Sequence, residues 1–244
     1  TLFSELGVKV TIVEMLERLL PMADPDISKA LTKSFQGQGI ELHIPAMVEK
    51  MEISGSGVTT TIKEGATIET ELALVCTGRR PLTDDLGLEE VGVATDKGFI
   101  TVDDYCCTSV PNIYAIGDVT GKWQLAHVAS RQADCAASNI LGAEDHEDYS
   151  IVPSAVYTHP EIAWVGLTAE EAKTQHGEVR TATFPMMASG LALAYQSTNG
   201  FAKITVGEND EILGAYVMCP HAPDLIQEVA GLMKSERNRH ELAA

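Results

Sequence analysis

Residues 108–118 have the sequence TSVPNIYAIGD, in which a short apolar run leads directly into a glycine and an aspartate. The run at 113–116 is typical of a strand buried on both faces of a parallel sheet. Gly117 removes a side chain where a ligand must pass, and Asp118 can accept a hydrogen bond from a polyol hydroxyl. The stretch therefore predicts an α/β fold with a ligand-binding edge at Asp118. A Gly-Asp turn before an ordinary helix is the alternative interpretation.

The residues after this turn predict a helix from about 125 to 141 that is rich in small side chains. The helix opens at Gln124-Leu125-Ala126-His127. Main-chain N–H groups and the positive end of the helix dipole favour negative charge at such an opening. We therefore expect these four residues to face an anionic part of a ligand.

The N-terminal segment predicts the second half of a Rossmann-type βαβ unit. The chain is expected to begin inside a helix that Gly7 ends, since no N-cap residue precedes it. A β-branched strand at 8–13 runs directly into Glu14. A helix at Pro25–Gln38 and a short strand at Ile40–Ile44 follow.

Glu14 is a candidate ligand for a nucleotide. An acidic residue at the end of the second Rossmann strand can accept both hydroxyls of an adenosine ribose. Its charge would repel a 2′-phosphate, so it favours NAD over NADP. The Gly-rich turn that binds the pyrophosphate would lie about 20 residues earlier, before Thr1, so that half of the site is expected to be missing. A solvated loop glutamate is the alternative.

A β-meander is predicted from Val48 to Ile68, with turns at 55–57 and at Glu64-Gly65. The apolar run Leu72–Cys76 then predicts a strand buried on both faces of a parallel sheet. Gly78 lies beyond its carboxyl end, where ligands of such sheets bind, although a plain turn glycine fits equally well. Val48 is a candidate for packing against an adenine face, with a core valine as the alternative.

The residues beyond an acidic, polar linker at Glu144–Ser150 predict a mixed α+β domain. Ala155–Gly166 predicts a strand, and Thr168 opens a helix with a capping-box sequence. A turn is expected at Asn209-Asp210. Three further strands, one helix and the opening of a last helix are expected at 179–184, 201–206, 212–218, 223–234 and 240–244.

Composition excludes several classes of function. The 244 residues include 35 acidic and 17 basic ones, and the formal charge of -18 is a poor match to nucleic acid or to anionic membrane surfaces. No run of 18 uncharged apolar residues and no charged leader before an apolar stretch is present, so neither a membrane span nor a signal peptide is expected. The cysteines and histidines lack metal-ligand spacing, so no metal site is expected.

The five cysteines are expected to be free or buried thiols in a reducing cytoplasm. Cys106 and Cys107 are adjacent in the sequence. A disulfide between neighbours strains the peptide that joins them, so a vicinal redox pair is the disfavoured alternative.

Five stretches, in order, resemble the pyridine nucleotide-disulfide oxidoreductases, and among them the dihydrolipoamide dehydrogenases. They extend over nearly the whole chain: Val13-Glu14, CTGRRP at 76–81, NIYAIGDVTG at 112–121, LAH at 125–127 and YTHPEIAWVG at 157–166. The resemblance implies that Glu14, Val48 and Gly78 contact NAD and that Asp118 holds the ribitol of FAD. It also implies that Gln124, Leu125, Ala126 and His127 line the flavin ring.

The same resemblance implies three domains and an activity. Residues 1–80 would be a truncated, Rossmann-like NAD-binding domain, 81–150 the C-terminal part of an FAD-binding domain, and 151–244 an α+β dimerisation domain with an antiparallel sheet. The intact enzyme would pass electrons from dihydrolipoamide through a redox-active disulfide and FAD to NAD. It would work as a homodimer in the cytoplasm or the mitochondrial matrix, with 2-oxo acid dehydrogenase complex components as possible partners.

Several groups of this family have no counterpart in the sequence. They are the Gly-rich turns for FAD and NAD, the redox-active cysteine pair and the C-terminal His-Glu pair. His159-Pro160-Glu161 imitates the last pair but matches an earlier motif of the dimerisation domain, so no catalytic residue is expected and the chain alone should be inactive. A mercuric reductase or transhydrogenase of the same family, or a non-catalytic binding or dimerisation module, is the alternative. Glu14 disfavours NADP-preferring relatives such as glutathione reductase.

Overall fold

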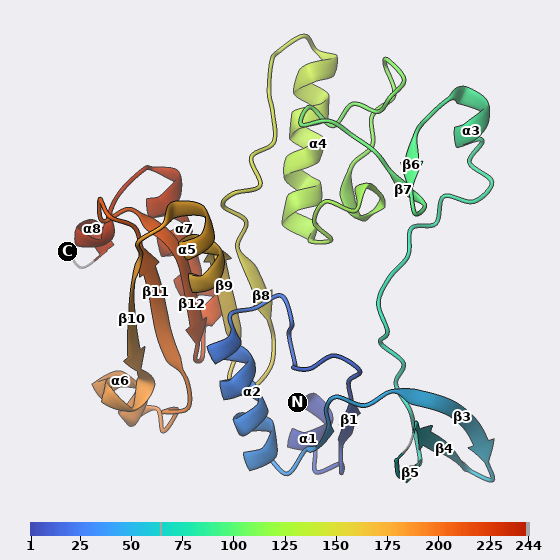
Figure 1. Cartoon of the computed structure of the whole chain (residues 1–244), viewed down its shortest axis with the longest axis vertical. Helices are drawn as coiled ribbons and strands as arrows, with labels where there is room; N and C mark the ends of the chain where they lie inside the picture. Colours follow the sequence, from blue (N-terminus) through green and yellow to red (C-terminus); the bar gives the residue numbers. More distant parts are fainter. Residues whose placement is uncertain (64, 243–244) are drawn as a thin grey trace. The chain divides into compact units, whose positions relative to one another are not determined.

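The computed structural model describes residues 1–63 and 65–242, and it divides into two compact units. One unit combines Thr1–Leu74 with Pro153–Ala244, and the other is Val75–Val152 (Figure 1). Glu64 of the predicted turn and Ala243-Ala244 of the predicted last helix lie outside the described residues. Within those described residues, no helix combines the length and apolar character needed to cross a bilayer.

The first unit begins with the predicted βαβ segment. Helix α1 (Leu2–Glu5) ends before Gly7, whose φ of +81° fits the left-handed residue that follows a helix. Strand β1 (Thr11–Val13) pairs in parallel with β2 (Glu41–His43). The predicted strand at 8–13 is shorter than expected, because β2 supplies only three paired residues and Val10 contributes just its carbonyl, which accepts from the Glu41 N–H at 3.0 Å.

Helix α2 (Pro25–Gly37) and the meander confirm their predictions. Asp24 caps α2, since its carboxylate accepts the Asp26 N–H at 3.0 Å and proline occupies the first turn, where its missing N–H costs nothing. The meander consists of three antiparallel strands, β3 (Val48–Ser54), β4 (Gly57–Ile62) and β5 (Thr67–Thr70).

The strand predicted at Leu72–Cys76 is wrong. These residues form no strand, and Leu72 and Leu74 are 84% and 80% exposed. A buried parallel strand needs a hydrogen-bonded neighbour on each side. The described chain offers only β1 and β2 in parallel, and neither pairs with this segment.

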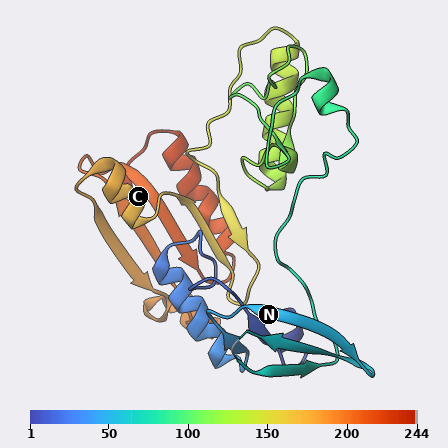
Figure 2. The same ribbon diagram turned by 45° about the vertical axis from the view of Figure 1, so that its right-hand side comes forward.

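A five-stranded antiparallel sheet dominates the rest of this unit. Its order is β10-β11-β12-β9-β8. Helix α7 (Ala222–Lys234) packs against β9 and β12, and α2 lies along the sheet (Figures 1 and 2). The strands are β8 (Ser154–Val156), β9 (Ile162–Gly166), β10 (Arg180–Pro185), β11 (Phe201–Val206) and β12 (Ile212–Met218). The smaller helices are α5 (Ala169–His176), η2 (Met186–Ala188), α6 (Gly190–Ala194) and α8 (Arg239–Leu242).

One prediction for this sheet is wrong and the others are confirmed. Ala155–Gly166 is a hairpin of β8 and β9, not one strand, because Pro160 in the connection has no N–H to donate to a ladder. The predicted capping box is present, since Thr168 accepts the Glu171 N–H and the Glu171 carboxylate accepts the Thr168 N–H. Asp210, with a φ of +67°, lies in the predicted turn between β11 and β12.

The core of this unit joins parts of the chain that are distant in sequence. Ile27, Leu31 and Phe35 of α2 pack in one cluster with sheet residues that include Trp164 and Tyr216. The rings of Trp164 and Tyr216 stack with centroids 6.4 Å apart.

An ion pair reinforces this junction. Lys203 Nζ on β11 donates to both carboxylate oxygens of Asp24, at 2.9 and 3.0 Å, and to Asp26 at 2.7 Å. The side chains of Lys203 and Asp24 are only 10% and 2% exposed. The N-terminal segment is thereby joined to the C-terminal sheet.

The second unit has one long helix, α4 (Ala126–Ile140), and little regular structure besides α3 (Leu88–Val91), β6 (Thr95–Asp96), β7 (Phe99–Ile100) and η1 (Gly117–Thr120). The strand predicted at 113–116 is wrong, because Tyr114 alone forms a bridge, with Cys107. Ala115 is buried but Ile116 is 39% exposed. An apolar run becomes a buried strand only if other strands flank it, and none of the described strands does so here.

Candidate functional site

Asp118 occupies the first turn of η1, directly after Gly117, whose φ is +77°. Its carboxylate is half exposed and pairs with Arg79, with 3.0 Å between Oδ2 and Nη1. Arg79 Nη2 also donates to the carbonyl of Gln124 at 3.2 Å. Arg79 therefore brings together two residues that the sequence predicted for the same ligand, Asp118 and Gln124.

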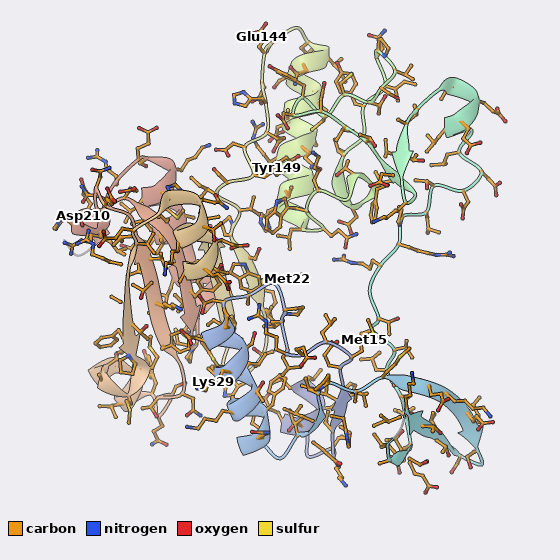
Figure 3. All side chains as sticks on the ribbon, viewed as in Figure 1. Met15, Met22, Lys29, Glu144, Tyr149 and Asp210 are labelled. Carbon is orange, nitrogen blue, oxygen red and sulfur yellow. The ribbon has the colours of Figure 1, made fainter. Side chains whose placement is uncertain are left out.

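Gln132 is a second residue that sequence reasoning missed. Its side chain is fully buried, and its Oε1 accepts the Gly117 N–H at 2.6 Å while its Nε2 donates to the hydroxyl of Tyr149 at 2.9 Å. Tyr149 lies beside α4 (Figure 3), and burial raises its pKa although the bond from Gln132 lowers it. The available signal in the sequence was the position of Gln132, one helical turn after the apolar Val128. These contacts fix the turn that presents Asp118, and they attach part of the predicted linker Glu144–Ser150 to the helix.

Helix α4 begins close to the predicted position, and its N-terminus has no side-chain cap among the described residues. Leu125 is the N-cap, with extended φ and ψ of -130° and 136°, and its side chain makes no capping hydrogen bond within the described chain. The first intrahelical bond of this turn runs from the Ala129 N–H to the Leu125 carbonyl. Ala126 and His127 are exposed. The first turn of α4 therefore lies at the surface of its unit, with N–H groups at the positive end of the helix dipole.

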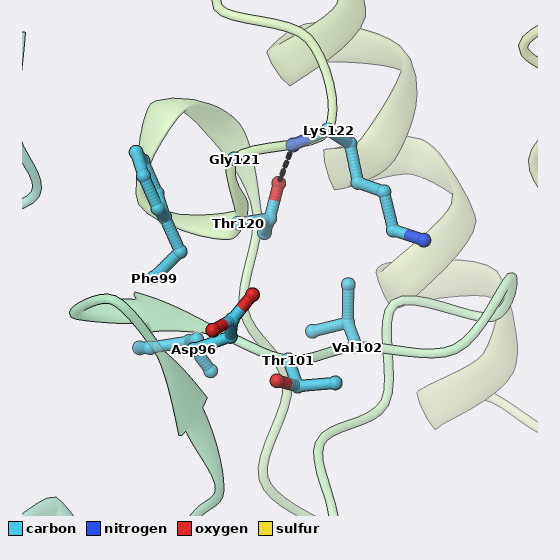
Figure 4. A pocket seen from close by; sticks show the side chains of 8 residues that line it. Asp96, Phe99, Thr101, Val102, Thr120, Gly121 and Lys122 are labelled. Atoms are coloured by element: carbon cyan, nitrogen blue, oxygen red, sulfur yellow. Dashed lines mark hydrogen bonds between the residues drawn. The ribbon is translucent and has the colours of Figure 1, made fainter.

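A small pocket lies beside the end of η1 (Figure 4). Thr120 Oγ1 donates to the Gly117 carbonyl at 2.9 Å and accepts the Lys122 N–H at 3.5 Å. A side chain at Gly121 would collide with the ring of Phe99, 2.8 Å from its Cγ. The predicted site residues do not line this pocket. The two hydrogen bonds of Thr120 hold the turn after Asp118 in place.

Glu14 lies at the carboxyl end of β1, as predicted. Its main chain continues the parallel pairing, since its N–H donates to the His43 carbonyl at 3.1 Å and its carbonyl accepts the Ala46 N–H at 2.7 Å. Its carboxylate is oriented by the Leu16 N–H, which donates to Oε1 at 2.8 Å. Val48, at the start of β3, is 37% exposed, so it belongs to the surface of this unit.

Gly78 belongs to the other unit. Its φ is +108°, which favours glycine, and a Cβ there would meet no atom within 4 Å. The glycine is therefore required by backbone conformation, in an exposed segment without regular structure.

All five cysteines are free thiols, which confirms the predicted pattern of cysteine use. Cys76 is exposed, and Cys106, Cys135 and Cys219 are buried. Burial raises the pKa of Cys106 to about 12 and also raises the pKa values of Cys135 and Cys219. His159 is exposed, with Nδ1 3.5 Å from the carboxylate of Glu5. These groups form no nucleophile and base pair of the kind that catalysis of thiol exchange requires.

Two models of known protein families match this chain. The family model of the pyridine nucleotide-disulphide oxidoreductases matches residues 1–133, and the model of the dimerisation domain of the same proteins matches residues 152–244. The chain belongs to this family. The α/β fold class expected from the sequence, with a Rossmann-like part and a dimerisation domain, is thereby confirmed.

Individual members of the family are similar along the whole chain. A dihydrolipoyl dehydrogenase of Chlamydia muridarum is 44% identical over 238 residues, 97% of this chain and 51% of the relative. That of Geobacillus stearothermophilus is 38% identical over 248 residues, 100% of this chain and 53% of the relative. The chain thus spans about half the length of these family members.

Solved structures are also similar to this chain. The crystal structure of LpdA from Mycobacterium tuberculosis has a TM-score of 0.92 and 33% identity, with 99% of this chain and 53% of that chain covered. A Cu(II) complex of the HOCl-induced flavoprotein disulfide reductase RclA from Escherichia coli has a TM-score of 0.90 and 29% identity, with 97% and 55% covered.

Proposed function

We propose that this chain is part of a dihydrolipoyl dehydrogenase. The intact protein passes electrons from dihydrolipoamide, through a redox-active disulfide and FAD, to NAD. The observation that carries the proposal is the match to dihydrolipoyl dehydrogenases over 97% of this chain at 44% identity. The positions of the two acidic candidates support the proposal. Glu14 directly follows β1, and Asp118 lies in the first turn of η1.

The residues around Asp118 fit an FAD molecule. FAD, when bound, supplies the two-electron transfer between the dithiol and NAD. Asp118 would accept a hydrogen bond from a ribitol hydroxyl, and the uncapped turn at Gln124, Leu125, Ala126 and His127 would offer its N–H groups to the flavin ring. An aspartate or serine at the N-cap would have satisfied these N–H groups internally, and the leucine there does not.

The residues around Glu14 fit an NAD molecule. Its hydrogen bond to Leu16 occupies only part of the acceptor capacity of the carboxylate, so ribose hydroxyls can still donate to it. Val48 would contact the adenine by the resemblance to the family, and Gly78, which lies in the other unit, stays a candidate NAD contact on the same ground. The proposed domain boundaries remain 1–80, 81–150 and 151–244.

The protein works as a homodimer in the cytoplasm under this proposal. The match of residues 152–244 to a dimerisation-domain model supports self-association. Components of a 2-oxo acid dehydrogenase complex are the proposed partners, because such complexes present lipoyl groups as dithiol substrates.

The test begins with intact mass and the flavin absorbance spectrum of the protein purified from its native gene. We expect a yellow protein with a mass above 26.2 kDa that reduces NAD with dihydrolipoamide. We expect no such activity from this chain alone. A yellow protein that reduces mercuric ion, or that only exchanges hydride between nucleotides, would identify a different member of the family. A colourless 26.2 kDa product would identify a non-catalytic binding or dimerisation module.

A further inference from the structure

Three buried side chains from separate segments of the second unit converge beside α4. Cys135 lies on α4, Cys106 precedes it in the chain, and Glu147 follows in the segment after the helix. The two sulfurs and a carboxylate oxygen of Glu147 all lie within 4.8 Å of one another. Both cysteines are 0% exposed.

Glu147 makes this cluster unusual. Its side chain is 3% exposed, and its Oε1 has no hydrogen-bond partner among the described residues. Arg131 forms an ion pair with Glu147, but its Nε lies 3.6 Å from Oε1, too far for a hydrogen bond. Arg131 instead makes a bidentate pair with Asp145, at 2.6 and 2.7 Å. A buried carboxylate oxygen without a donor needs a cation or a proton to offset its desolvation.

We propose that Cys106, Cys135 and Glu147 bind one zinc ion. Thiolate and carboxylate groups are ordinary zinc ligands, and tetrahedral zinc with Zn–S bonds of about 2.3 Å places two ligand sulfurs about 3.8 Å apart. Because the three ligand atoms already lie within 4.8 Å of one another, they need to move by only about 1 Å to reach this geometry. The sequence does not reveal the site, because its ligands are far apart in the chain.

The surroundings of Cys135 suit a metal-bound thiolate. Asn139 Nδ2 lies 3.5 Å from the sulfur and donates to it, and such outer hydrogen bonds orient metal ligands. When protonated, the Cys135 thiol donates to the carbonyl oxygens of Asp145 at 3.4 Å and of Asp104 at 3.8 Å, and once zinc replaces that proton either oxygen could complete the coordination.

The charge balance is also favourable. Zinc binding releases one proton from each thiol as the two Zn–S bonds form, so a divalent cation replaces two protons and the net charge of the cluster is unchanged.

The backbone conformation at Cys106 is consistent with the proposed zinc site. Its φ is +62°, in the left-handed region that non-glycine residues rarely adopt. The turn is held by Asp103, whose Oδ1 accepts the N–H groups of Tyr105 and Cys107, both at 2.9 Å. This turn holds Cys106 in the buried cluster with Cys135, while Cys107 stays outside the ligand set. The zinc would attach both flanking segments to α4 as a closed structural site.

The experiment uses the full-length flavoprotein. It is purified under reducing conditions without chelator, its zinc is counted by elemental mass spectrometry, and cobalt is then exchanged into the site. The variants are Cys135→Ser and Glu147→Gln. The matched controls are Cys107→Ser, next to Cys106 but outside the ligand set, and Glu144→Gln, an exposed residue of the same segment (Figure 3).

We expect one zinc ion per chain and, with cobalt, an ultraviolet band for sulfur-to-metal charge transfer. Loss of an outer hydrogen bond costs about 10- to 100-fold in metal affinity, so loss of a ligand in either variant should cost at least that much, and the controls should bind as the parent does. Absence of metal and of the cobalt band in the reduced parent protein would overturn the proposal, whether or not the variants fold. A parent protein two hydrogens lighter, with Cys106 joined to Cys135 in a disulfide, would also overturn it.

Discussion

Replacing Lys203 by methionine should destabilise the unit built from residues 1–74 and 153–244 by about 3–5 kcal/mol, the usual cost of removing one partner of a buried ion pair. Methionine keeps an apolar stem of similar length but removes the charge that pairs with Asp24. The Asp24 carboxylate, only 2% exposed, is then left without its cation. The side chain of Asp26 is 60% exposed, so the loss of its ion pair with Lys203 adds at most about 1 kcal/mol.

The assay is urea unfolding followed by the fluorescence of Trp164, in a Trp123→Phe background. Trp164 belongs to the same core as α2, so its emission reports on this unit. The control is Lys50→Met, which removes an ion pair with Glu52 of 2.7 Å between exposed groups and should cost at most about 1 kcal/mol. Adding Asp24→Asn to Lys203→Met should restore part of the loss, because no buried charge remains. A cost for Lys203→Met no larger than that for Lys50→Met would refute the reasoning.

Three further predictions concern the candidate site and the surface. In the full-length enzyme, Glu14→Arg should shift the ratio of kcat/KM for NAD to kcat/KM for NADP toward NADP by about tenfold or more, equivalent to about 1.4 kcal/mol. The control Glu17→Arg, at an exposed position, should leave this ratio unchanged. An unchanged ratio in Glu14→Arg would remove Glu14 from the site. Gln132→Leu leaves the Gly117 N–H buried without an acceptor and should cost about 1–3 kcal/mol in thermal unfolding, whereas Gln36→Leu at an exposed position is the control and should cost much less. A cost for Gln132→Leu no larger than that for Gln36→Leu would show that the bond to Gly117 is unimportant. Arg239, Arg180 and His240 lower the pKa of Asp210, so its contribution to stability is present above the unfolded value of about 3.9 and is lost as the pH falls toward the folded value. The stability difference between the parent and Asp210→Asn should therefore shrink on acidification, and a difference that grew would contradict the ion-pair assignment.

Local signals in the sequence were sufficient for most helices and hairpins. The capping box at Thr168, the proline at the start of α2 and the alternation in β3 and β4 each depend on residues a few positions apart, and all are present. Leu72–Cys76 and 113–116 failed because an apolar run becomes a strand only when other strands flank it. That condition depends on distant parts of a chain, which periodicity does not report.

In the candidate site, too, residues identified by local sequence could be predicted and residues identified by distant contacts could not. Glu14 and Asp118 could be placed in advance, since each follows a predicted element directly. Arg79 and Gln132 could not, because their roles depend on contacts with Asp118 and Gly117 across 39 and 15 residues. The binding roles of the predicted residues stay predictions until cofactor titrations of the variants test them.

The core that joins α2 to the C-terminal sheet has a consequence for synthesis on the ribosome. Lys203 reaches Asp24 across 179 residues, and the apolar face of α2 packs against strands that begin only at Ser154 and end at Met218. At elongation rates of about 5–20 residues per second, that face waits roughly 10–35 s for its partner. The intervening residues 75–152, which form a compact unit of their own, can fold during this interval. Until those strands leave the exit tunnel, only neighbouring residues such as Ile12, Ile40 and Leu42 are available to cover Ile27, Leu31 and Phe35.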